Sequence, residues 1–464
     1  MFKKSLLTTI LAITSFALAG CGDSTGDRDE SSAKQPYAST YSPLPSGITL
    51  IRGATVLTGD GERIDDGDVL IRDGKIAEVG SGLKAPRKAT VVDGEGKWVT
   101  PGIIDTHSHL GVYPSPSVWA HSDGNEMTAP NTAEVWAEHS VWPQDPGFDT
   151  ARIGGITAMQ ILPGSANLFG GRSVTVKNVP SRTVQGLKFP GAPHGLKMAC
   201  GENPKAVYGL GRGTAPSTRM GNVAGYRAAW VAAVDYREKW IDYEAGKTTM
   251  RPTHDLQMET LLGVLDGEIL VHNHCYRADE MAIMLDVARE FGYKVTSFHH
   301  AVESYKIADL LAAEGVCSSV WADWWGFKIE AFDMVRENAA LLEEAGACAI
   351  IHSDSEYGIQ RLNQEAAKAM AAGRRAGIEM DEAVAIRWIT LNAAKALGID
   401  DRTGTLTEGK MADVVLWDRN PFSVYARTEQ VYVDGALVYD RNDPSRQPRT
   451  DFSLGLLEVN GEIL

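Results

Sequence analysis

Cysteine is scarce in this chain, with five residues among 464. Cys21 lies near the start, and the others are Cys200, Cys275, Cys317 and Cys348. Their spacing matches neither a zinc knuckle nor a CxxC redox pair, which excludes both of those classes. An exported protein can pair cysteines of this kind, but the sequence alone does not say which. We expect the four later cysteines to be single buried thiols.

Positively charged residues are also fewer than negatively charged ones. The chain has 45 Lys and Arg against 60 Asp and Glu, a net charge of −15. This balance disfavours non-specific binding to nucleic acid and to anionic lipid. A Gly-rich segment at residues 163–171 lacks the Lys-Ser/Thr pair of a phosphate-binding loop, so it does not indicate a nucleotide site. We therefore predict no nucleic-acid partner.

Long apolar runs are few. Residues 6–18 form one that is too short for a comfortable membrane span and follows a short basic start, as in a signal peptide. The run ends Leu18-Ala19-Gly20-Cys21, which resembles the lipobox of bacterial lipoproteins; the alternative is an ordinary secretory signal. We predict that residues 1–21 direct export, that Cys21 is lipidated, and that the chain is anchored in the envelope. The residue after Cys21 is Gly22 and not Asp, which favours anchoring in the outer membrane, on its periplasmic side.

Residues 22–46 are rich in Ser, Asp, Gly and Pro and read as a flexible tether. Residues 47–100 and 401–464 contain short strands with Gly/Asp turns, which predict a small β-sandwich built from both ends of the chain. Residues 101–400 alternate strands and helices, including a strand at 156–162 and a helix at 278–290. This alternation predicts a (β/α)8 barrel, a TIM barrel of the α/β class, whose functional groups lie at the carboxyl ends of its strands.

Two strand ends carry the strongest chemical pattern. His107 and His109 follow an apolar strand, and His352 and Asp354 follow another. Side chains two apart in a strand share a face, so each pair points the same way. Two imidazoles can hold a divalent metal, and a carboxylate beside it can act as a general base. We predict that His107 and His109 are metal ligands and Asp354 is the base; Asp354 as a helix cap is a compatible alternative.

Two further histidine pairs end predicted strands. His272 and His274 lie on one face of their strand, and only one of the two rings need reach the metal. His299 and His300 are adjacent and point to opposite faces. We therefore expect at most one of them to be a ligand and the other to pack behind the strand.

A ligand from a middle strand is needed to bridge two metals. Glu202 lies just past the end of a strand, whereas Lys197 lies nearer its start and would have to be carbamylated. The position favours Glu202, and a simple turn residue is its alternative. The number of metals, one or two, stays open.

Several residues are candidates for the substrate pocket. His352 shares a face with Asp354 and either contacts substrate or supports the site. Arg172 ends the Gly-rich segment, which is either a substrate loop suited to an anionic group or a tight turn between strand and helix. Tyr276 and Arg277 follow His274 and either contact substrate or begin a helix. Trp321, Trp324 and Trp325 either wall the pocket or fill the core.

These motifs together resemble the amidohydrolase superfamily, in the branch of the imidazolonepropionases and related enzymes. The resemblance covers about residues 47–440 and rests on residues 99–109, His274 with Arg277-Ala278-Asp279, His300, His352-Ser353-Asp354, and residues 391–398 and 409–415. It implies a metal-bearing barrel whose metal-site residues are His107, His109, His274, His300 and Asp354.

The resemblance implies hydrolysis of an amide-type C–N bond in a dipeptide, an N-acyl amino acid or a cyclic amide. Zinc is the expected metal, with manganese or iron as alternatives. Alternative functions are ester, lactone or phosphoester hydrolysis at the same centre, and a surface lipoprotein that binds metal without turnover. The expected partner is a small-molecule substrate. We expect contact with the membrane only through the lipid at Cys21. Whether the chain forms a homo-oligomer is left open.

Overall fold

The computed structural model describes residues 37–115, 117–448, 458–459 and 462–463. The predicted signal peptide, Cys21 and most of the tether lie outside these residues. Residues 39–464 belong to one compact unit, and 37–38 belong to a separate one. Among the described helices, none has the length and apolar character needed to cross a membrane.

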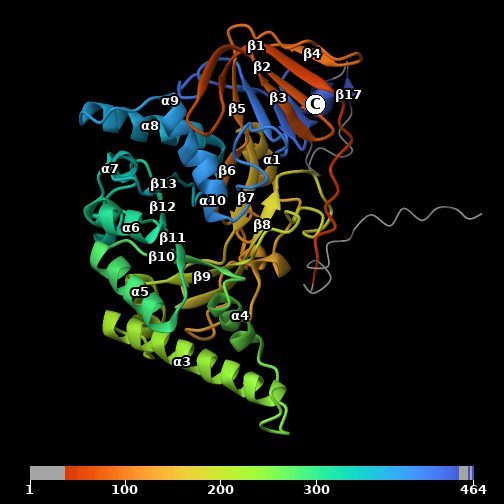
Figure 1. Cartoon of the computed structure of the whole chain (residues 1–464). Helices are drawn as coiled ribbons and strands as arrows, with labels where there is room; N and C mark the ends of the chain where they lie inside the picture. The colour runs from red at the N-terminus through yellow and green to blue at the C-terminus, as the bar shows by residue number, and fades with distance from the viewer. Residues whose placement is uncertain (1–36, 116, 449–457, 460–461, 464) are drawn as a thin grey trace, which may run out of the picture. The chain divides into compact units, whose positions relative to one another are not determined.

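Both ends of the chain join in one eight-stranded sheet (Figure 1). Its neighbours run in the order β16, β15, β14, β5, β1, β2, β3, with β4 also on β1. The strands are β1 Thr49–Leu57, β2 Arg63–Arg72, β3 Lys75–Gly80, β4 Thr90–Asp93, β5 Trp98–Pro101, β14 Val414–Trp417, β15 Thr428–Val433 and β16 Ala436–Asp440. The strands from both ends of the chain are linked in a single hydrogen-bonded sheet, and the small β-sandwich stays a prediction. A separate pair, β17 Glu458–Val459 and β18 Glu462–Ile463, follows.

The middle of the chain forms a second eight-stranded sheet that curls into a nearly closed barrel. Its strands, in spatial and chain order, are β6 Ile103–Ser108, β7 Ile156–Ile161, β8 Phe169–Lys177, β9 Gly195–Ala199, β10 Leu270–His274, β11 Val295–His299, β12 Cys317–Val320 and β13 Cys348–Ile351. The last and first strands are bridged at their ends, where Asp354 N donates to His107 O (3.0 Å). Ser353 completes the bridge by bonding the carboxylate of Asp105.

The barrel departs from an all-parallel (β/α)8 pattern at β8. This strand is antiparallel to both β7 and β9. The connection from β7 to β8 is a short turn at residues 162–168 without a helix, and a connection of that length can only return the chain antiparallel. From β9 onward, the strands β9 to β13 are mutually parallel and each is followed by helix.

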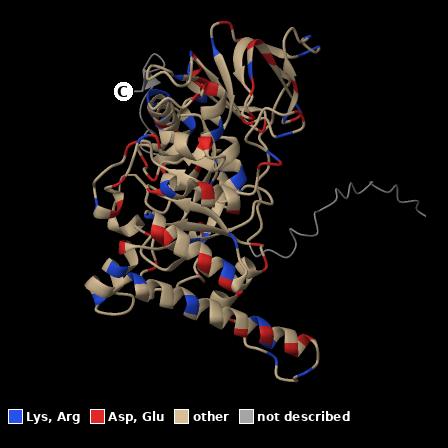
Figure 2. Ribbon diagram, turned by 60° about the vertical axis from the view of Figure 1, so that its left-hand side comes forward, with Lys and Arg blue, Asp and Glu red and all other residues tan. Residues whose placement is uncertain are grey.

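Ten α-helices lie within the described residues. They are α1 Pro146–Ile153, α2 Glu202–Lys205, α3 Arg219–Glu244, α4 Leu256–Leu265, α5 Ala278–Phe291, α6 Ala308–Glu314, α7 Asn338–Glu344, α8 Leu362–Arg375, α9 Glu382–Ala385 and α10 Leu391–Ala396. The predicted helix at 278–290 is confirmed as α5, and the predicted strand at 156–162 as β7. Charges of both signs are interspersed along the described ribbon (Figure 2).

The two sheets meet at Gly102, between β5 and β6. Its N–H donates to Asp413 O (2.8 Å), and a Cβ there would lie 2.0 Å from Thr157 Oγ1, so only glycine fits. The junction is reinforced by Lys177 of β8, which is fully buried and bonds Asp434 (2.8 Å) and Asp413 (3.2 Å).

The expectation of single thiols is wrong, because two disulfides join neighbouring strands. Cys317 and Cys348 are direct partners in the register of β12 and β13. Cys200 and Cys275 each follow the paired strand ends Ala199 and His274. Parallel register brings these thiols together, and register cannot be read from the spacing of cysteines along the chain.

Candidate metal centre

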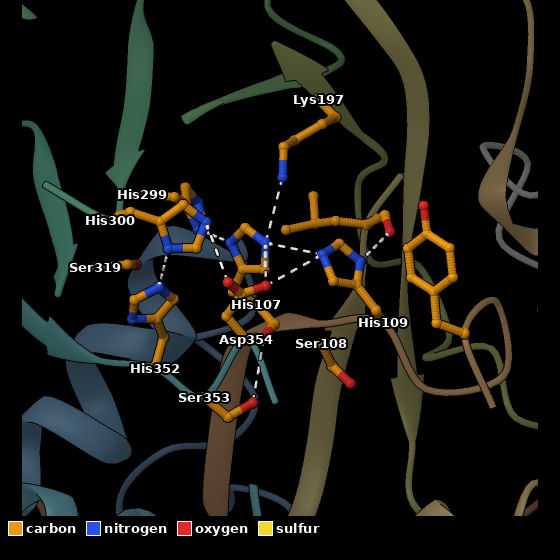
Figure 3. Close-up of polar contacts among 12 residues, drawn as sticks. His107, Ser108, His109, Lys197, His299, His300, Ser319, His352, Ser353 and Asp354 are labelled. Atoms are coloured by element: carbon orange, nitrogen blue, oxygen red, sulfur yellow. Dashed lines mark hydrogen bonds and ion pairs between the residues drawn. The ribbon is translucent and has the colours of Figure 1, made fainter. Parts of the chain in front are cut away.

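Five barrel strands deliver polar side chains to one end of the barrel, and Figure 3 shows those that come from β6, β9, β11 and β13. His107 lies on β6 with His109 just beyond it, and Lys197 lies on β9. The other side chains come from the ends of β10, β11 and β13 and are His272, His274, His299, His300, His352 and Asp354. The predicted meeting of the first and last strand ends is therefore present in the structure.

Three ligand-type atoms form a compact triangle. His107 Nε2 and His109 Nε2 are 3.3 Å apart, and Asp354 Oδ1 lies 3.5 Å from the first and 3.3 Å from the second. A tetrahedral ion with bonds of about 2.0–2.1 Å holds its ligand atoms roughly 3.3–3.4 Å apart. The triangle therefore has the edge lengths of one face of a metal coordination shell.

The orientation of His109 is set by its other ring nitrogen. His109 Nδ1 donates to Leu162 O at 2.8 Å, which leaves Nε2 with its lone pair toward the triangle. A backbone acceptor on the remote nitrogen is the usual support of a metal-binding histidine, since it fixes both tautomer and ring angle.

Lys197 reaches the same point from β9. Its Nζ lies 3.3 Å from His107 Nε2, and its side chain is completely buried. Burial lowers the pKa of Lys197 to about 7, against a smaller opposing effect of Asp354. The amine thus has a substantial neutral, nucleophilic fraction at neutral pH, which an ordinary lysine lacks.

Both members of the adjacent histidine pair enter the cluster, contrary to the expectation that one packs behind the strand. His299 Nδ1 contacts His107 Nδ1 (2.8 Å), while His300 Nε2 lies 3.8 Å from Asp354 Oδ2. His300 has φ of +55° and Asp354 has φ of +50°. The left-handed backbone of His300 breaks the alternation of side chains along the strand. His300 therefore points into the barrel although its neighbour His299 does so too.

His274 has two free ring nitrogens. It is 3% exposed, and neither Nδ1 nor Nε2 has a hydrogen-bond partner among the described residues. Its ring centre is 4.8 Å from that of His300. A buried imidazole without partners costs free energy, and a metal ion is a natural partner for it. His272, two residues earlier, bonds His299 Nε2 through Nδ1 (2.9 Å) and so supports the cluster from below.

His352 lies on the opposite side of His300. Its Nδ1 donates to Val320 O (2.9 Å) and its Nε2 contacts His300 Nδ1 (2.7 Å). Ligand atoms of His107, His300 and His352 lie within 4.8 Å of one another, as do those of His107, His109 and Asp354. His352, predicted to meet substrate, is thus also within reach of a metal.

Burial keeps these histidines neutral. It lowers the pKa of His352 to about 4 and that of His272 to about 3, and it lowers the pKa of His107, His274 and His300 well below the usual value. Neutral imidazole is the form that binds a metal, so the cluster does not need to lose protons first.

An aromatic wall flanks the cluster. Trp321 stacks on His300 with ring centres 4.4 Å apart and on Trp324 at 4.9 Å. Tyr276, which is 3% exposed, has its ring 4.9 Å from His274. Tyr276 and Trp321 therefore border the metal-type cluster, whereas Trp325 is 59% exposed.

Three predicted residues have their contacts elsewhere. Glu202 lies 3.6 Å from Lys328 Nζ and is outside both ligand groups, so the geometry favours Lys197 over it. Arg172 points out of the barrel, where Nε donates to Thr260 Oγ1 (2.8 Å), because it alternates with the inward Ser173. Arg277 pairs with Asp279 at 3.0 Å.

Asp105 was missed by sequence reasoning. It is fully buried on β6, and burial raises its pKa to about 7 despite hydrogen bonds from Ser353 and His107 N–H. By holding Ser353 it fixes the backbone beside Asp354. The period-two pattern Asp105-His107-His109 was the available signal, since it puts all three on one face.

Residues 98–443 match the model of the amidohydrolase family, so the chain belongs to this family. This confirms the predicted resemblance at the level of the superfamily and an enzyme of that type. The solved amidohydrolase from Thermotoga maritima MSB8 is similar to it, with 35% identity and a TM-score of 0.78 over 85% of this chain and 100% of that one.

Two curated proteins are also similar. Amidohydrolase tasK of Hapsidospora irregularis is 32% identical over 430 residues, which is 84% of this chain but 43% of that protein. The chain thus spans less than half the length of this relative. A 5-methylthioadenosine/S-adenosylhomocysteine deaminase of Halalkalibacterium halodurans is 32% identical over 110 residues, or 23% of each chain.

Proposed function

We propose that this chain is a metal-dependent hydrolase that cleaves an amide-type carbon–nitrogen bond in a small molecule. The observation that carries the proposal is the triangle of His107, His109 and Asp354, whose edges fit a metal coordination shell. Membership of the amidohydrolase family supports the reaction class. Binding alone would not require a carboxylate positioned as Asp354 is, within reach of both metal and substrate water.

The residues fit two neighbouring metal positions. His107, His109 and Asp354 would hold one ion, and His274 and His300 a second, with His352 close by; the unpartnered nitrogens of His274 support this role. Zinc suits neutral imidazole with carboxylate, and manganese or iron would accept similar ligands. When bound, the metal would lower the pKa of water and polarise the substrate carbonyl.

Lys197 replaces Glu202 in this proposal as the ligand from the fourth strand. Its neutral Nζ would attack the carbon of CO₂ and form an N–C bond as one C=O π bond opens. Release of one proton from nitrogen would leave a carbamate whose single negative charge is shared by two oxygens. The pKa of about 7 makes the amine available for this step near neutral pH. Glu202 is engaged with Lys328 instead.

Asp354 would move the proton. Its carboxylate would accept the proton of the attacking water and transfer it to the departing nitrogen. Tyr276 lies beside His300 and would donate a hydrogen bond from its hydroxyl to the substrate carbonyl as negative charge develops on the carbonyl oxygen. His352, whose Nδ1–H is donated to Val320 O, would accept from His300 through Nε2 and hold that ring in place. The strained φ of Asp354 would hold its carboxylate in line with both histidines.

The aromatic side chains beside the histidine cluster favour a substrate with a flat apolar part. Trp321, Trp324 and Tyr276 present ring faces and edges beside the histidine cluster. N-acyl amino acids, dipeptides and cyclic amides with aromatic or aliphatic rings match this wall better than strongly charged compounds. Arg172, which points away, is not available for an anionic substrate group.

We also propose that the chain is exported and anchored by a lipid at Cys21, at the periplasmic side of an outer membrane. The lipobox-like sequence before Cys21 supports the anchor. The disulfides Cys200–Cys275 and Cys317–Cys348 support an oxidising compartment, since such bonds are rare in the reducing cytosol.

The experiment is to measure metal per chain on purified protein without residues 1–21, together with turnover of a panel of N-acyl amino acids, dipeptides and cyclic amides. We expect one to two metals per chain and hydrolysis that stops with a chelator and returns with zinc or manganese. A protein that binds no metal after such addition would refute the proposal. Turnover of esters or lactones only would replace the amide reaction by its nearest alternative.

A further inference from the structure

A cavity lies outside the barrel, between helices α3 and α5, which run side by side in Figure 1. Its volume is about 530 Å³, and none of its lining residues belongs to the histidine cluster. Its walls are mainly apolar and are formed by Val223, Tyr226, Ile283, Met284 and Cys200. A cavity of this size accommodates a small organic molecule.

Two buried side chains in the wall have acceptor oxygens without partners. Glu280 is 6% exposed, and its Oε2 has no hydrogen bond within the described part of the chain. Asn222 is 2% exposed; its Nδ2 donates to Gly201 O (3.0 Å), but among the described residues its Oδ1 accepts nothing. Both atoms require a donor, and leaving them without one costs free energy.

The charges around the cavity select the sign of the ligand. Arg219 at the rim is engaged by Asp279 (3.0 Å) and does not bond Glu280. Burial, with a smaller contribution from Glu330, raises the pKa of Glu280 to about 7. A buried carboxyl in this condition is relieved by a cation that brings both charge and donors, whereas an anion would face Asp279 and Glu280 together.

From these observations we propose that the cavity between α3 and α5 binds a small apolar amine in its ammonium form. The ammonium would donate to Glu280 Oε2 and Asn222 Oδ1, and the apolar body would pack on Val223, Ile283 and Met284. This site is separate from the proposed metal centre and does not depend on the hydrolytic function. Cys200 in its wall connects it through the disulfide to Cys275, next to His274.

Isothermal titration of the purified protein with 2-phenylethylammonium at pH 8 tests the proposal. At this pH the amine is charged and Glu280 is largely ionised. We expect saturable binding of one molecule per chain, retained after the metal is removed with a chelator, and much weaker binding of the neutral 2-phenylethanol and the anionic phenylacetate. Binding that disappears with the metal would instead locate the amine at the histidine cluster and overturn the proposal.

Two variants and one control localise the site. Glu280→Gln keeps the shape but removes the charge and should weaken binding by about 30-fold or more. Met284→Trp fills the cavity and should abolish binding. Glu290→Gln, on the same helix but paired with Arg227 on the surface, should bind as the wild type does. Equal affinity in wild type and Glu280→Gln, or no saturable heat in the wild type, would refute the proposal.

Discussion

Two lysines on neighbouring strands of the barrel are both completely buried, yet their surroundings are opposite. Lys177 on β8 contacts the carboxylates of Asp413 and Asp434. Lys197 on β9 contacts His107 Nε2 and, among the described residues, forms no ion pair within 4 Å. Burying a charged amine is costly unless carboxylates surround it. Lys177 is therefore a structural cation at the junction of the two sheets. Lys197 is instead an amine with a lowered pKa in the candidate metal centre.

The comparison predicts first that Lys197→Met removes turnover to the uncatalysed background. The variant loses the proposed carbamate and with it the metals that would polarise the substrate. The unfolding free energy of the metal-free variant should not fall, because a buried amine that must release its proton on folding is replaced by a neutral side chain of similar volume. Activity, metal content and urea denaturation measured on one preparation test this. A variant that keeps its metal and its activity would remove Lys197 from the site.

The second prediction concerns the carboxylate that faces Lys197 across the cluster. Asp354→Asn should lower kcat by roughly 10²–10⁴-fold, the usual range for a lost general base. The remaining histidines should retain most of the metal. The measurement is kcat with metal content, and full activity in the variant would show that Asp354 is not the base. Ser108, beside the cluster in Figure 3, offers a matched control as Ser108→Ala.

Lys177→Met gives the third prediction and the reverse pattern. The change leaves two buried carboxylates without their cation, which should lower the unfolding free energy by about 3–5 kcal/mol. At a temperature where the variant is still folded, its kcat should match the wild type. Adding Asp434→Asn to the variant should restore part of the stability, since one of the unpaired charges is then removed. A stable Lys177→Met variant without activity would contradict the division between the two lysines.

Much of the candidate site and of the barrel could be predicted from the sequence, and part could not. The strand ends with His107, His109, His274, His300 and Asp354 were predictable because period-two patterns identify the face that side chains share. The regular half of the barrel, β10 to β13, was predictable from its alternation with helices. The preference for Glu202 was based on its distance from the strand end, whereas the depth at which Lys197 reaches His107 depends on how the barrel curls.

Register and backbone strain were the other missing quantities. The two disulfides depend on which strands become neighbours, and no local pattern fixes that. The inward turn of both His299 and His300 depends on a left-handed residue that sequence patterns do not identify, since His is only one of several residues that can adopt it. Lys177 showed no signal of its own, because its carboxylate partners lie more than 200 residues away in the chain.

The smallest predicted effect is a pH dependence that belongs to Lys197 in metal-free, CO₂-free protein. Its pKa is about 7 in the folded chain against 10.5 for an ordinary lysine. Between these values the unfolded chain holds a proton that the folded chain lacks, so the free energy of unfolding should rise with pH across this window. Lys197→Met has no such group. The difference in stability, wild type minus variant, should therefore increase from pH 7.5 to 9.5 in urea titrations. A difference that stays constant would mean that Lys197 remains charged in the folded state, and its nucleophilic role would lose its physical basis.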